Sequence, residues 1–219
     1  MTLAFYGHPF SSYTQKALIA LYENRTSFEF KVIGPDAPEN FESLKNLWPL
    51  GKFPALDDQG VAVFESTTII EYLQLKHPGP VRLIPDDPEA AIEVRMMDRI
   101  FDNYVMTPMN WIVLDALRAP EERSARTVAD GRSLLETTYR WLEGRMAGRD
   151  WAFGDAFTLA DCAAAPSLFY ADWVHPISEE FANLRSYRSR LLARPSFARA
   201  VDDARPYRKY FPPGAPDRD

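Results

Sequence analysis

The pattern of the sequence changes at H-P-G-P-V-R-L-I-P-D-D-P, residues 77–88, where four prolines and a glycine fall within twelve residues. Before this segment, strand and helix patterns alternate; after it, apolar residues recur only at helical spacing. A chain divided in this way is expected to form a mixed α/β half and an all-helical half. We therefore predict an N-terminal domain over residues 1–77, a linker over 78–87 and a helical domain over 88–219.

The first half has the element order of a βαβ unit followed by a β-hairpin and a helix. In the second strand, apolar residues alternate so that Phe28, Phe30 and Val32 share one face. The hairpin turns at D-D-Q-G. The predicted elements are a strand at 2–6, a helix starting at Ser11 or Ser12, a strand at 27–33, a short helix near 41–47, strands at 52–56 and 61–64, and a helix at 66–76.

The second half contains no convincing strand. Helical patterns cover residues 88–118, 121–147, 158–171, 178–193 and 195–204. Pro108 and Pro166 fall inside such patterns, and each is predicted to kink or interrupt its helix because proline lacks the N–H donor. The tail P-P-G-A-P-D-R-D is predicted to be loosely ordered.

Composition limits the classes of function. The chain has 219 residues, 46% of them hydrophobic and 26% charged, with no apolar run of the ~20 residues that span a bilayer and no signal-peptide pattern, so we expect a cytoplasmic protein. One cysteine, Cys162, and three scattered histidines predict neither a disulfide nor a metal site. The net charge of −6 disfavours nucleic acids and anionic membranes as partners.

Two motifs carry a resemblance. The order of elements, with L-G-K-F-P-A-L and F-E-S-T-T-I-I-E-Y-L at these places, resembles the glutathione transferase family over nearly the whole chain. The resemblance implies a thioredoxin-like N-terminal domain, an all-α C-terminal domain and a cis bond before Pro54. Local preference alone favours a trans bond, since only about 5% of such bonds are cis.

The resemblance also implies a glutathione site. The Phe53 backbone would bind the cysteinyl part of glutathione like an added strand. Ser66 and its helix N-terminus would bind the γ-glutamyl carboxylate, with Glu65 facing the ammonium group and Lys52 near the glycyl end. The alternative is that Glu65 and Ser66 only cap the helix.

The segment S-S-Y-T-Q-K-A resembles the Ser-x-x-Ser/Thr-x-Arg/Lys-small pattern of the bacterial-like, serine-type branches. The resemblance makes Ser11 the catalytic hydroxyl that holds the glutathione thiolate, with Ser12 as the second candidate. An ordinary N-cap would explain Ser11 equally well. The tyrosine of the tyrosine-type branches aligns with Gly7, so Tyr6 is expected on the other face. Tyr13 replaces the cysteine of the maleylacetoacetate isomerases, which argues against that activity.

The second substrate is expected between the two halves, where pockets commonly form. Aromatic and apolar candidates indicate a hydrophobic electrophile: Phe10, Tyr13, Tyr104, Met109, Trp111, Phe169 and Trp173. In the helical half, Thr158 and Asp161 have the spacing of a capping box and are assigned to folding. By resemblance, the chain is expected to be a homodimer.

These expectations lead to one function and two alternatives. The leading prediction is a glutathione S-transferase that uses glutathione as co-substrate and no metal, with detoxification as the associated role. The same fold could support dehalogenation, ether cleavage, peroxidase or disulfide-reductase chemistry. The third possibility is a non-catalytic binding protein, because a fold does not fix a function.

Overall fold

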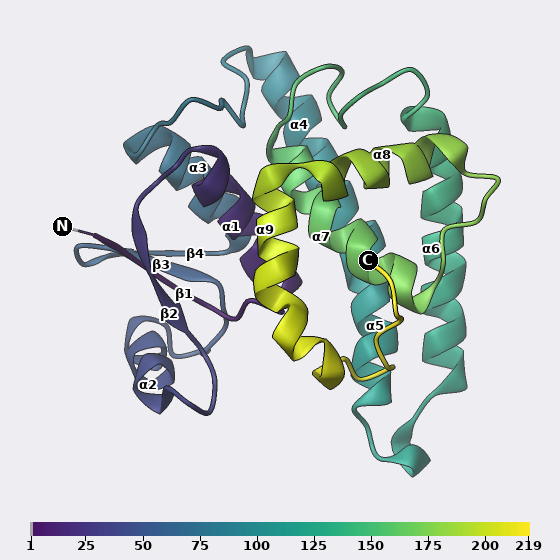
Figure 1. Ribbon diagram of the computed structural model, residues 1–219, viewed down its shortest axis with the longest axis horizontal. Coiled ribbons are helices and arrows are strands. Elements are labelled where there is room, and N and C mark those ends of the chain that lie inside the picture. The colour runs from purple at the N-terminus through teal and green to yellow at the C-terminus, as the bar shows by residue number, and fades with distance from the viewer. Residues whose placement is uncertain (1) are drawn as a thin grey trace.

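The computed structural model describes residues 2–219, and its first half consists of a small sheet with helices on both faces (Figure 1). Three strands lie within a residue or two of their predicted positions, whereas the third strand begins three residues later than the predicted 52–56 and includes Asp57 and Asp58, which leaves the turn at Gln59 and Gly60. The elements are β1 (Leu3–Gly7), α1 (Ser12–Glu23), β2 (Phe28–Val32), α2 (Pro38–Leu47), β3 (Ala55–Asp58), β4 (Val61–Phe64) and α3 (Ser66–Lys76).

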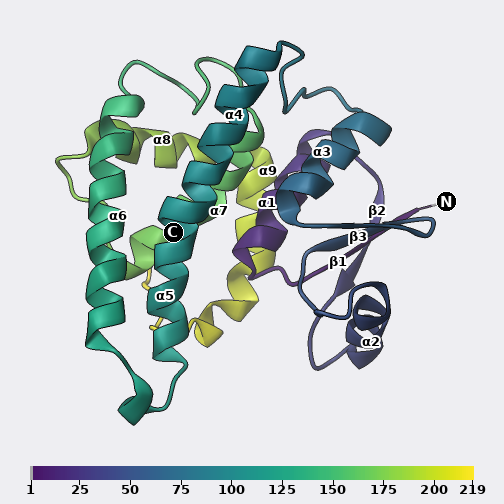
Figure 2. The ribbon, with the colours of Figure 1, turned by 180° about the vertical axis from the view of Figure 1, so that it is seen from behind.

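The four strands form one sheet in the order β2-β1-β3-β4. β1 is parallel to β2 and antiparallel to β3, and in this register Phe5 lies opposite Phe30 and Leu56. Phe5 belongs to the buried cluster shared with α1 and α3, whereas Tyr6 packs with Leu44 of α2 on the other face. Figures 1 and 2 show α1 and α3 on the face of the sheet toward the helical half.

The second half is helical and is built around α7. All sixteen residues of this helix are buried. It contacts α1 of the first half and α4, α5 and α8 of its own half, and thereby joins the two halves. The elements are α4 (Pro88–Ile100), a π-helical segment (Phe101–Met106), α5 (Thr107–Ala116), a 3₁₀ turn (Pro120–Glu122), α6 (Ala125–Arg145), α7 (Leu159–Val174), α8 (Ala182–Ala193), α9 (Pro195–Ala204) and a 3₁₀ segment (Arg205–Tyr210).

The two prolines that were expected to disturb helices behave differently. Before Pro108, the α-helical hydrogen bonding of α4 gives way to the π-helical segment, and Pro108 sits in the first turn of α5, where its missing N–H leaves no gap. α7 continues through Pro166, so of the predicted kink or interruption the interruption does not occur. Burial on every side holds α7 together despite the lost hydrogen bond.

The C-terminal tail is docked, which corrects the expectation of a loose tail. Asp219 pairs with Arg205 (2.6 Å) and Arg208 (2.9 Å), and Arg218 pairs with Asp172 of α7. Phe211 is buried in the core of the helical half. These contacts join residues far apart in the sequence, so the local composition of the tail does not reveal them.

Candidate active site

Two adjoining cavities lie between the halves, and Tyr13 and Phe53 line both of them. One has a volume of about 400 Å³ and lies at the N-terminus of α3, while the other, of about 450 Å³, lies at the N-terminus of α1. The first is polar and is lined by Tyr13, Trp48, Lys52, Phe53, Pro54, Glu65, Ser66, Arg99, Asp102 and Asn103. The second is mainly apolar and is lined by His8, Phe10, Ser11, Ser12, Tyr13, Phe53, Met109, Asn110, Val113, Leu114, Leu117, Tyr170, Tyr210, Phe211 and Pro212.

Ser11 is the N-cap of α1 and faces the apolar cavity. The Thr14 N–H donates to Ser11 Oγ (3.3 Å), so the hydroxyl acts as an acceptor toward the helix. Its own hydrogen remains free to be donated outward. The first N–H groups of α1, at Ser12 and Tyr13, also have no intrahelical partner. This helix end therefore presents a hydroxyl donor, backbone donors and the positive end of a helix dipole to one place.

The end of β1 leaves no room for a tyrosine. A Cβ atom at Gly7 would lie 2.6 Å from Thr14 Cγ2, because β1 and α1 approach each other closely there. Tyr6 packs beside Ile33 and Leu44 on the far face, and burial raises the pKa of its phenol. Neither position can supply an activated phenolate, and Ser11 and Ser12 are the hydroxyls that line the cavity at the N-terminus of α1 beside Tyr13.

The N-terminus of α3 is open. Glu65 precedes the helix with φ 66° and ψ 125°, a conformation rare for residues other than glycine, and its side chain makes no capping hydrogen bond. Ser66 is buried, and the polar cavity lies directly in front of it. The interpretation of these two residues as a simple side-chain cap is therefore wrong. The orphan N–H groups and the helix dipole face a cavity instead, which is an arrangement suited to an anion.

Beside α3, the Phe53–Pro54 peptide bond is cis, as the resemblance implied and local preference did not. β3 begins at Ala55, which pairs with Tyr6 and Phe64, so Phe53 lies just outside the ladder. Its backbone groups thus border the cavity without a strand partner. Lys52 is exposed on the rim, and Trp48, which the sequence did not single out, forms a wall against Phe64 with ring centroids 4.3 Å apart.

A buried ionic network supports the floor of the polar cavity. Lys16 Nζ of α1 pairs with Asp98 (2.6 Å) and Asp102 (2.7 Å) and donates to Thr67 Oγ1 of α3 (2.9 Å). Arg99 pairs with Asp102 at 2.7 Å from the solvent side. Asp102 Oδ1 is buried and has no hydrogen-bond partner among residues 2–219. An unsatisfied buried carboxylate oxygen at a cavity wall marks a place for a donor, such as an ammonium group.

The structure brings some of the expected substrate-pocket residues together and leaves others outside. Phe10, Tyr13 and Met109 line the apolar cavity. Tyr104 and Trp111 are 50% and 39% exposed and do not line it. Two more of the expected aromatics pack behind the wall that Tyr170 and Phe211 form: Phe169 and Trp173. Phe169 and Tyr170 are adjacent in α7, and Tyr170 is the one on the cavity side. The sequence does not show which of the two lines the cavity.

Two side chains of the cavities have shifted acidities. Burial lowers the pKa of His8, whose Nδ1 accepts the Phe10 N–H (3.1 Å), so its ring is neutral with the proton on Nε2. Burial, together with Asp102, raises the pKa of Tyr13 to about 12, so its phenol stays protonated. The apolar cavity therefore carries two neutral donors, the imidazole of His8 and the phenol of Tyr13.

Comparison with known proteins identifies the family. The family models for the glutathione S-transferase N-terminal domain and C-terminal domain match residues 5–81 and 122–190. The chain belongs to the glutathione S-transferase family. It is 28% identical over 212 residues to a glutathione S-transferase of Silene vulgaris, covering 92% of this chain and 97% of the relative. It is 26% identical over 201 residues to a probable maleylacetoacetate isomerase of Caenorhabditis elegans, covering 90% and 91%.

Among solved structures, a glutathione S-transferase of Methylobacterium radiotolerans in complex with glutathione sulfonate is 31% identical to this chain. It aligns with a TM-score of 0.77 and covers 92% of this chain and 95% of its own. These findings confirm the family and the fold that the sequence predicted: a mixed four-stranded N-terminal domain and a helical C-terminal domain.

Across the described residues 2–219, this member of the glutathione S-transferase family has neither a metal-binding cluster nor a membrane-spanning helix. Within residues 2–219, no three side chains of His, Cys, Asp or Glu lie close enough together to hold a metal ion. In the same part of the chain, no helix combines the length and apolar character needed to cross a membrane. Cys162 is fully buried in α7, and burial raises the pKa of its thiol well above the ordinary value.

Proposed function

We propose that the protein is a glutathione transferase that activates the glutathione thiol for attack on a hydrophobic electrophile. One observation carries this proposal. Two helix N-termini, of α1 and α3, open into adjoining cavities that share Tyr13 and Phe53. One cavity suits a charged peptide and the other an apolar molecule. The relative bound to glutathione sulfonate supports the choice of ligand.

In this proposal, residues 1–77 supply most of the contacts to glutathione, and Asp102 of the helical half supplies one more. The uncapped N-terminus of α3 and Ser66 bind the γ-glutamyl carboxylate, and the free backbone of Phe53 binds the cysteinyl part. Glu65 and the unpartnered Asp102 Oδ1 accept from the ammonium group. Lys52, exposed on the rim, pairs with the glycyl carboxylate.

Ser11 supplies the activation. Lowering the pKa of the thiol by about 2 units requires about 2.7 kcal/mol of preferential stabilisation of the thiolate. A hydroxyl donating to an anion contributes about 1.5 to 3 kcal/mol, and a helix N-terminus about 0.3 to 2 kcal/mol. Ser11 and the N-terminus of α1 together reach the required amount. Ser12, the first residue of the same helix, is the second candidate.

The helical half, residues 88–219, supplies the apolar site. Phe10 and Tyr170 meet edge to face with centroids 5.5 Å apart, and Phe211 closes the same wall. Met109 of α5 lines the same cavity. An apolar acceptor would be held here beside Ser11, so that proximity adds to thiol activation.

The two alternatives remain distinguishable. Dehalogenation, ether cleavage, peroxidase or disulfide-reductase chemistry would use the same thiolate on a different electrophile, so a panel of electrophiles separates these reactions. Isomerisation of maleylacetoacetate is disfavoured by Tyr13 in the S-S-Y segment, although three relatives at 26% identity carry that name. A binding protein without catalysis would leave the thiol unactivated.

The deciding experiment titrates the ultraviolet absorbance of the glutathione thiolate against pH in the presence of excess protein. The native protein should bind glutathione and ionise its thiol well below the free value of about 8.5. Ser11→Ala should abolish this shift, and Ser12→Ala should leave it. An unshifted thiol in the native protein would contradict the proposal and favour the binding protein.

A matched control separates activation from helix capping. Ser124 caps α6 by accepting the Thr127 N–H (3.2 Å), as Ser11 caps α1, and it lines neither cavity. Loss of either cap should lower the free energy of unfolding by about 1 kcal/mol. Only Ser11→Ala should change the thiol titration. A change of similar size in Ser124→Ala would show that the effect is one of general stability.

We further propose that the protein is a cytoplasmic homodimer. Ile92 and Met96 lie one turn apart on α4 and are 67% and 48% exposed, which is an apolar stripe suited to a second copy. Light scattering should give twice the chain mass of 25.0 kDa. Ile92→Asp combined with Met96→Asp should give the mass of one chain. A native mass of one chain would contradict the dimer.

A further inference from the structure

A separate cavity, of about 430 Å³, lies between the end of α7, α8 and the C-terminal tail. It shares no lining residue with the two cavities of the active site. Its volume falls in the range of small-molecule sites. Three arginines and two aspartates contribute to its lining: Arg185, Arg188, Arg218, Asp172 and Asp219. We refer to it below as the tail cavity.

Arg188 of α8 lines the tail cavity with unused hydrogen-bond donors. Its side chain is only 11% exposed, and its guanidinium lies over the ring of Phe169, 5.8 Å from the ring centroid. The Nε and Nη2 atoms are buried and have no hydrogen-bond partner within residues 2–219. These two nitrogens form one edge of the planar guanidinium, so their N–H groups point the same way. Two adjacent unused donors at a cavity wall mark a place for an acceptor.

The carboxylate beside Arg188 is already engaged. Asp172 Oδ2 lies 3.2 Å from Arg188 Nη2, which compensates the charge but is not a hydrogen bond. The same oxygen pairs with Arg218 of the tail, and Asp172 Oδ1 accepts the Ile177 N–H (2.7 Å). Asp172 therefore has no oxygen left for the free edge of Arg188.

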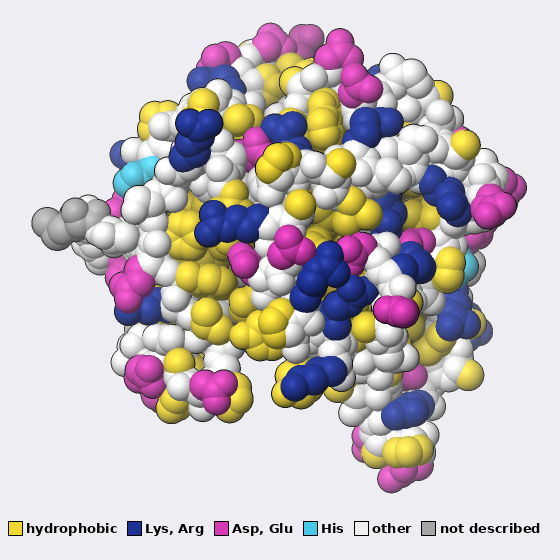
Figure 3. Space-filling model, in the orientation of Figure 1, with side chains coloured by type: hydrophobic (Ala, Val, Ile, Leu, Met, Phe, Trp, Pro, Cys, Tyr) yellow, Lys and Arg dark blue, Asp and Glu magenta, His cyan; other side chains and the backbone are white. Residues whose placement is uncertain are grey.

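The second aspartate of the lining is neutralised from outside the tail cavity. Asp219 pairs with Arg205 (2.6 Å) and Arg208 (2.9 Å), neither of which lines the cavity. Arg185 is exposed, and its Nη1 donates only to the Ile177 carbonyl oxygen (3.3 Å). The cavity is therefore positive, although the chain has a net charge of −6. Figure 3 shows Lys and Arg side chains gathered on the face where the chain ends.

We propose that the tail cavity binds a small molecule through a phosphate group, either inorganic phosphate or a small phosphate monoester. Nε and Nη2 of Arg188 would donate to two phosphate oxygens, and Arg185 would add its charge from the exposed side. A dianion with several oxygens matches this excess of guanidinium groups better than a carboxylate does. The site is separate from the glutathione cavities, so the proposal stands whether or not the protein transfers glutathione.

The test is an NMR titration of the ¹⁵N-labelled full chain with sodium phosphate at about pH 8, with sodium chloride added to keep the ionic strength constant. Amide signals of residues 172–178 and 185–189 should shift along one saturable curve. Acetate should bind about tenfold more weakly, because it carries a single charge. Shifts that do not saturate, shifts confined to residues around the two active-site cavities, or equal affinities for phosphate and acetate would overturn the proposal.

A second titration separates the two sources of the phosphate group. Glycerol 3-phosphate carries the same dianion on a small polar body that the cavity volume admits. Tighter binding of glycerol 3-phosphate than of phosphate would identify a monoester as the ligand. Tighter binding of phosphate would identify the free anion. Absence of binding for both would overturn the proposal.

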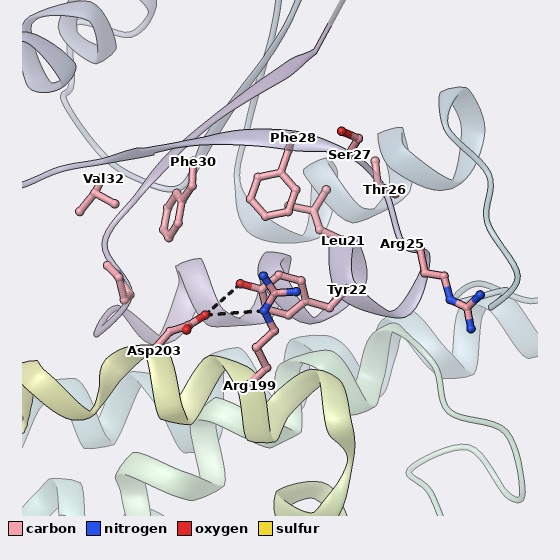
Figure 4. A pocket seen from close by; sticks show the side chains of 11 residues that line it. Leu21, Tyr22, Arg25, Thr26, Ser27, Phe28, Phe30, Val32, Arg199 and Asp203 are labelled. Atoms are coloured by element: carbon pink, nitrogen blue, oxygen red, sulfur yellow. Dashed lines mark hydrogen bonds and ion pairs between the residues drawn. The ribbon is translucent and has the colours of Figure 1, made fainter.

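Two variants and a matched control test the arginines. Arg188→Gln should weaken phosphate binding about tenfold, and Arg185→Gln, at an exposed position that the fold tolerates, about threefold. The control is Arg199→Gln. Arg199 lines a different cavity, where it lies over the Tyr22 ring and 3.9 Å from Asp203 (Figure 4), so its loss should change nothing. Thermal midpoints show which variants fold. Unchanged phosphate binding in either folded variant, Arg188→Gln or Arg185→Gln, would overturn the proposal.

Discussion

Lys16 Nζ lies 2.7 Å from Asp102 Oδ2 in an ion pair that crosses from the sheet domain to the helical domain, with 1% and 8% of the two side chains exposed. Asp98, 2.6 Å from the same nitrogen, is equally buried. Lys16 thus pairs with two carboxylates from the buried side and Arg99 pairs with both from the solvent side, in an environment that penalises an unpaired charge. The pair stands directly beneath the polar cavity, so the junction of the domains and the floor of the site are one structure.

Replacing this lysine should therefore be costly. We expect Lys16→Met to lower the free energy of unfolding by about 3 kcal/mol, the lower end of the range for a broken buried pair, because Arg99 remains as a counterion for both Asp98 and Asp102. Urea unfolding followed by circular dichroism measures this change. The control is Arg126→Met, which breaks the exposed pair with Asp130 (2.8 Å) on α6 and should leave stability unchanged within error. Equal effects of the two variants would contradict the assigned role.

The structure confirms the predicted capping box of Thr158 and Asp161 and shows further hydrogen bonds to Asp161. Asp161 is fully buried and accepts hydrogen bonds from the Thr158 N–H (2.8 Å), the Ala152 N–H (2.8 Å) and the Tyr187 hydroxyl (2.6 Å). It therefore ties the preceding loop and α8 to the start of α7. Asp161→Asn turns an NH₂ group toward one set of these donors and should lower the free energy of unfolding by about 3 kcal/mol.

The control for Asp161 is a cap that an amide can replace. Asp87 is exposed at the start of α4 and accepts only the Ala90 N–H (2.8 Å), and asparagine caps a helix as well as aspartate does. Asp87→Asn should therefore leave the thermal midpoint almost unchanged, while Asp161→Asn lowers it clearly. Similar midpoints for both variants would show that the buried bonds to Ala152 and Tyr187 add nothing to the cap.

The sequence predicted features that depend on interactions between nearby residues, and it missed features that depend on contacts between distant residues. Hydrophobic periodicity and turn residues act over a few positions, and they located the strands, the helices and Ser11 at the start of α1. The pairing of Lys16 with Asp98 and Asp102 joins residues more than eighty positions apart, and no local pattern shows it. The docked tail escaped prediction for the same reason, since Arg218 finds Asp172 on α7.

The lining of the apolar cavity could likewise be predicted only in part from the sequence. Phe169, Tyr170 and Trp173 are all aromatic and all on α7, so composition treats them alike. The tilt and rotation of α7 against α1 place Tyr170 at the wall and the other two behind it. Tertiary packing sets this rotation. The sequence therefore predicted the aromatic character of the site and only part of its lining.

The last prediction uses the acidity of His8. Its pKa in an unfolded chain is about 6.5, and burial lowers the pKa in the folded protein. Above about pH 6.5 the imidazole is neutral in both states and contributes no pH dependence. As the pH falls from there toward the folded-state pKa, the unfolded chain takes up the proton first, so the stability of the folded protein decreases.

His8→Asn should remove this loss. The asparagine Oδ1 can accept the Phe10 N–H in place of Nδ1, and the side chain does not titrate. Thermal unfolding at about pH 8 compares the two proteins with both side chains uncharged, which isolates any loss of packing against Tyr207, 4.5 Å away between ring centroids. The fall in the midpoint between about pH 8 and about pH 5.5 should then be smaller for the variant. Parallel midpoint curves for the two proteins would show that His8 is not held neutral by the fold.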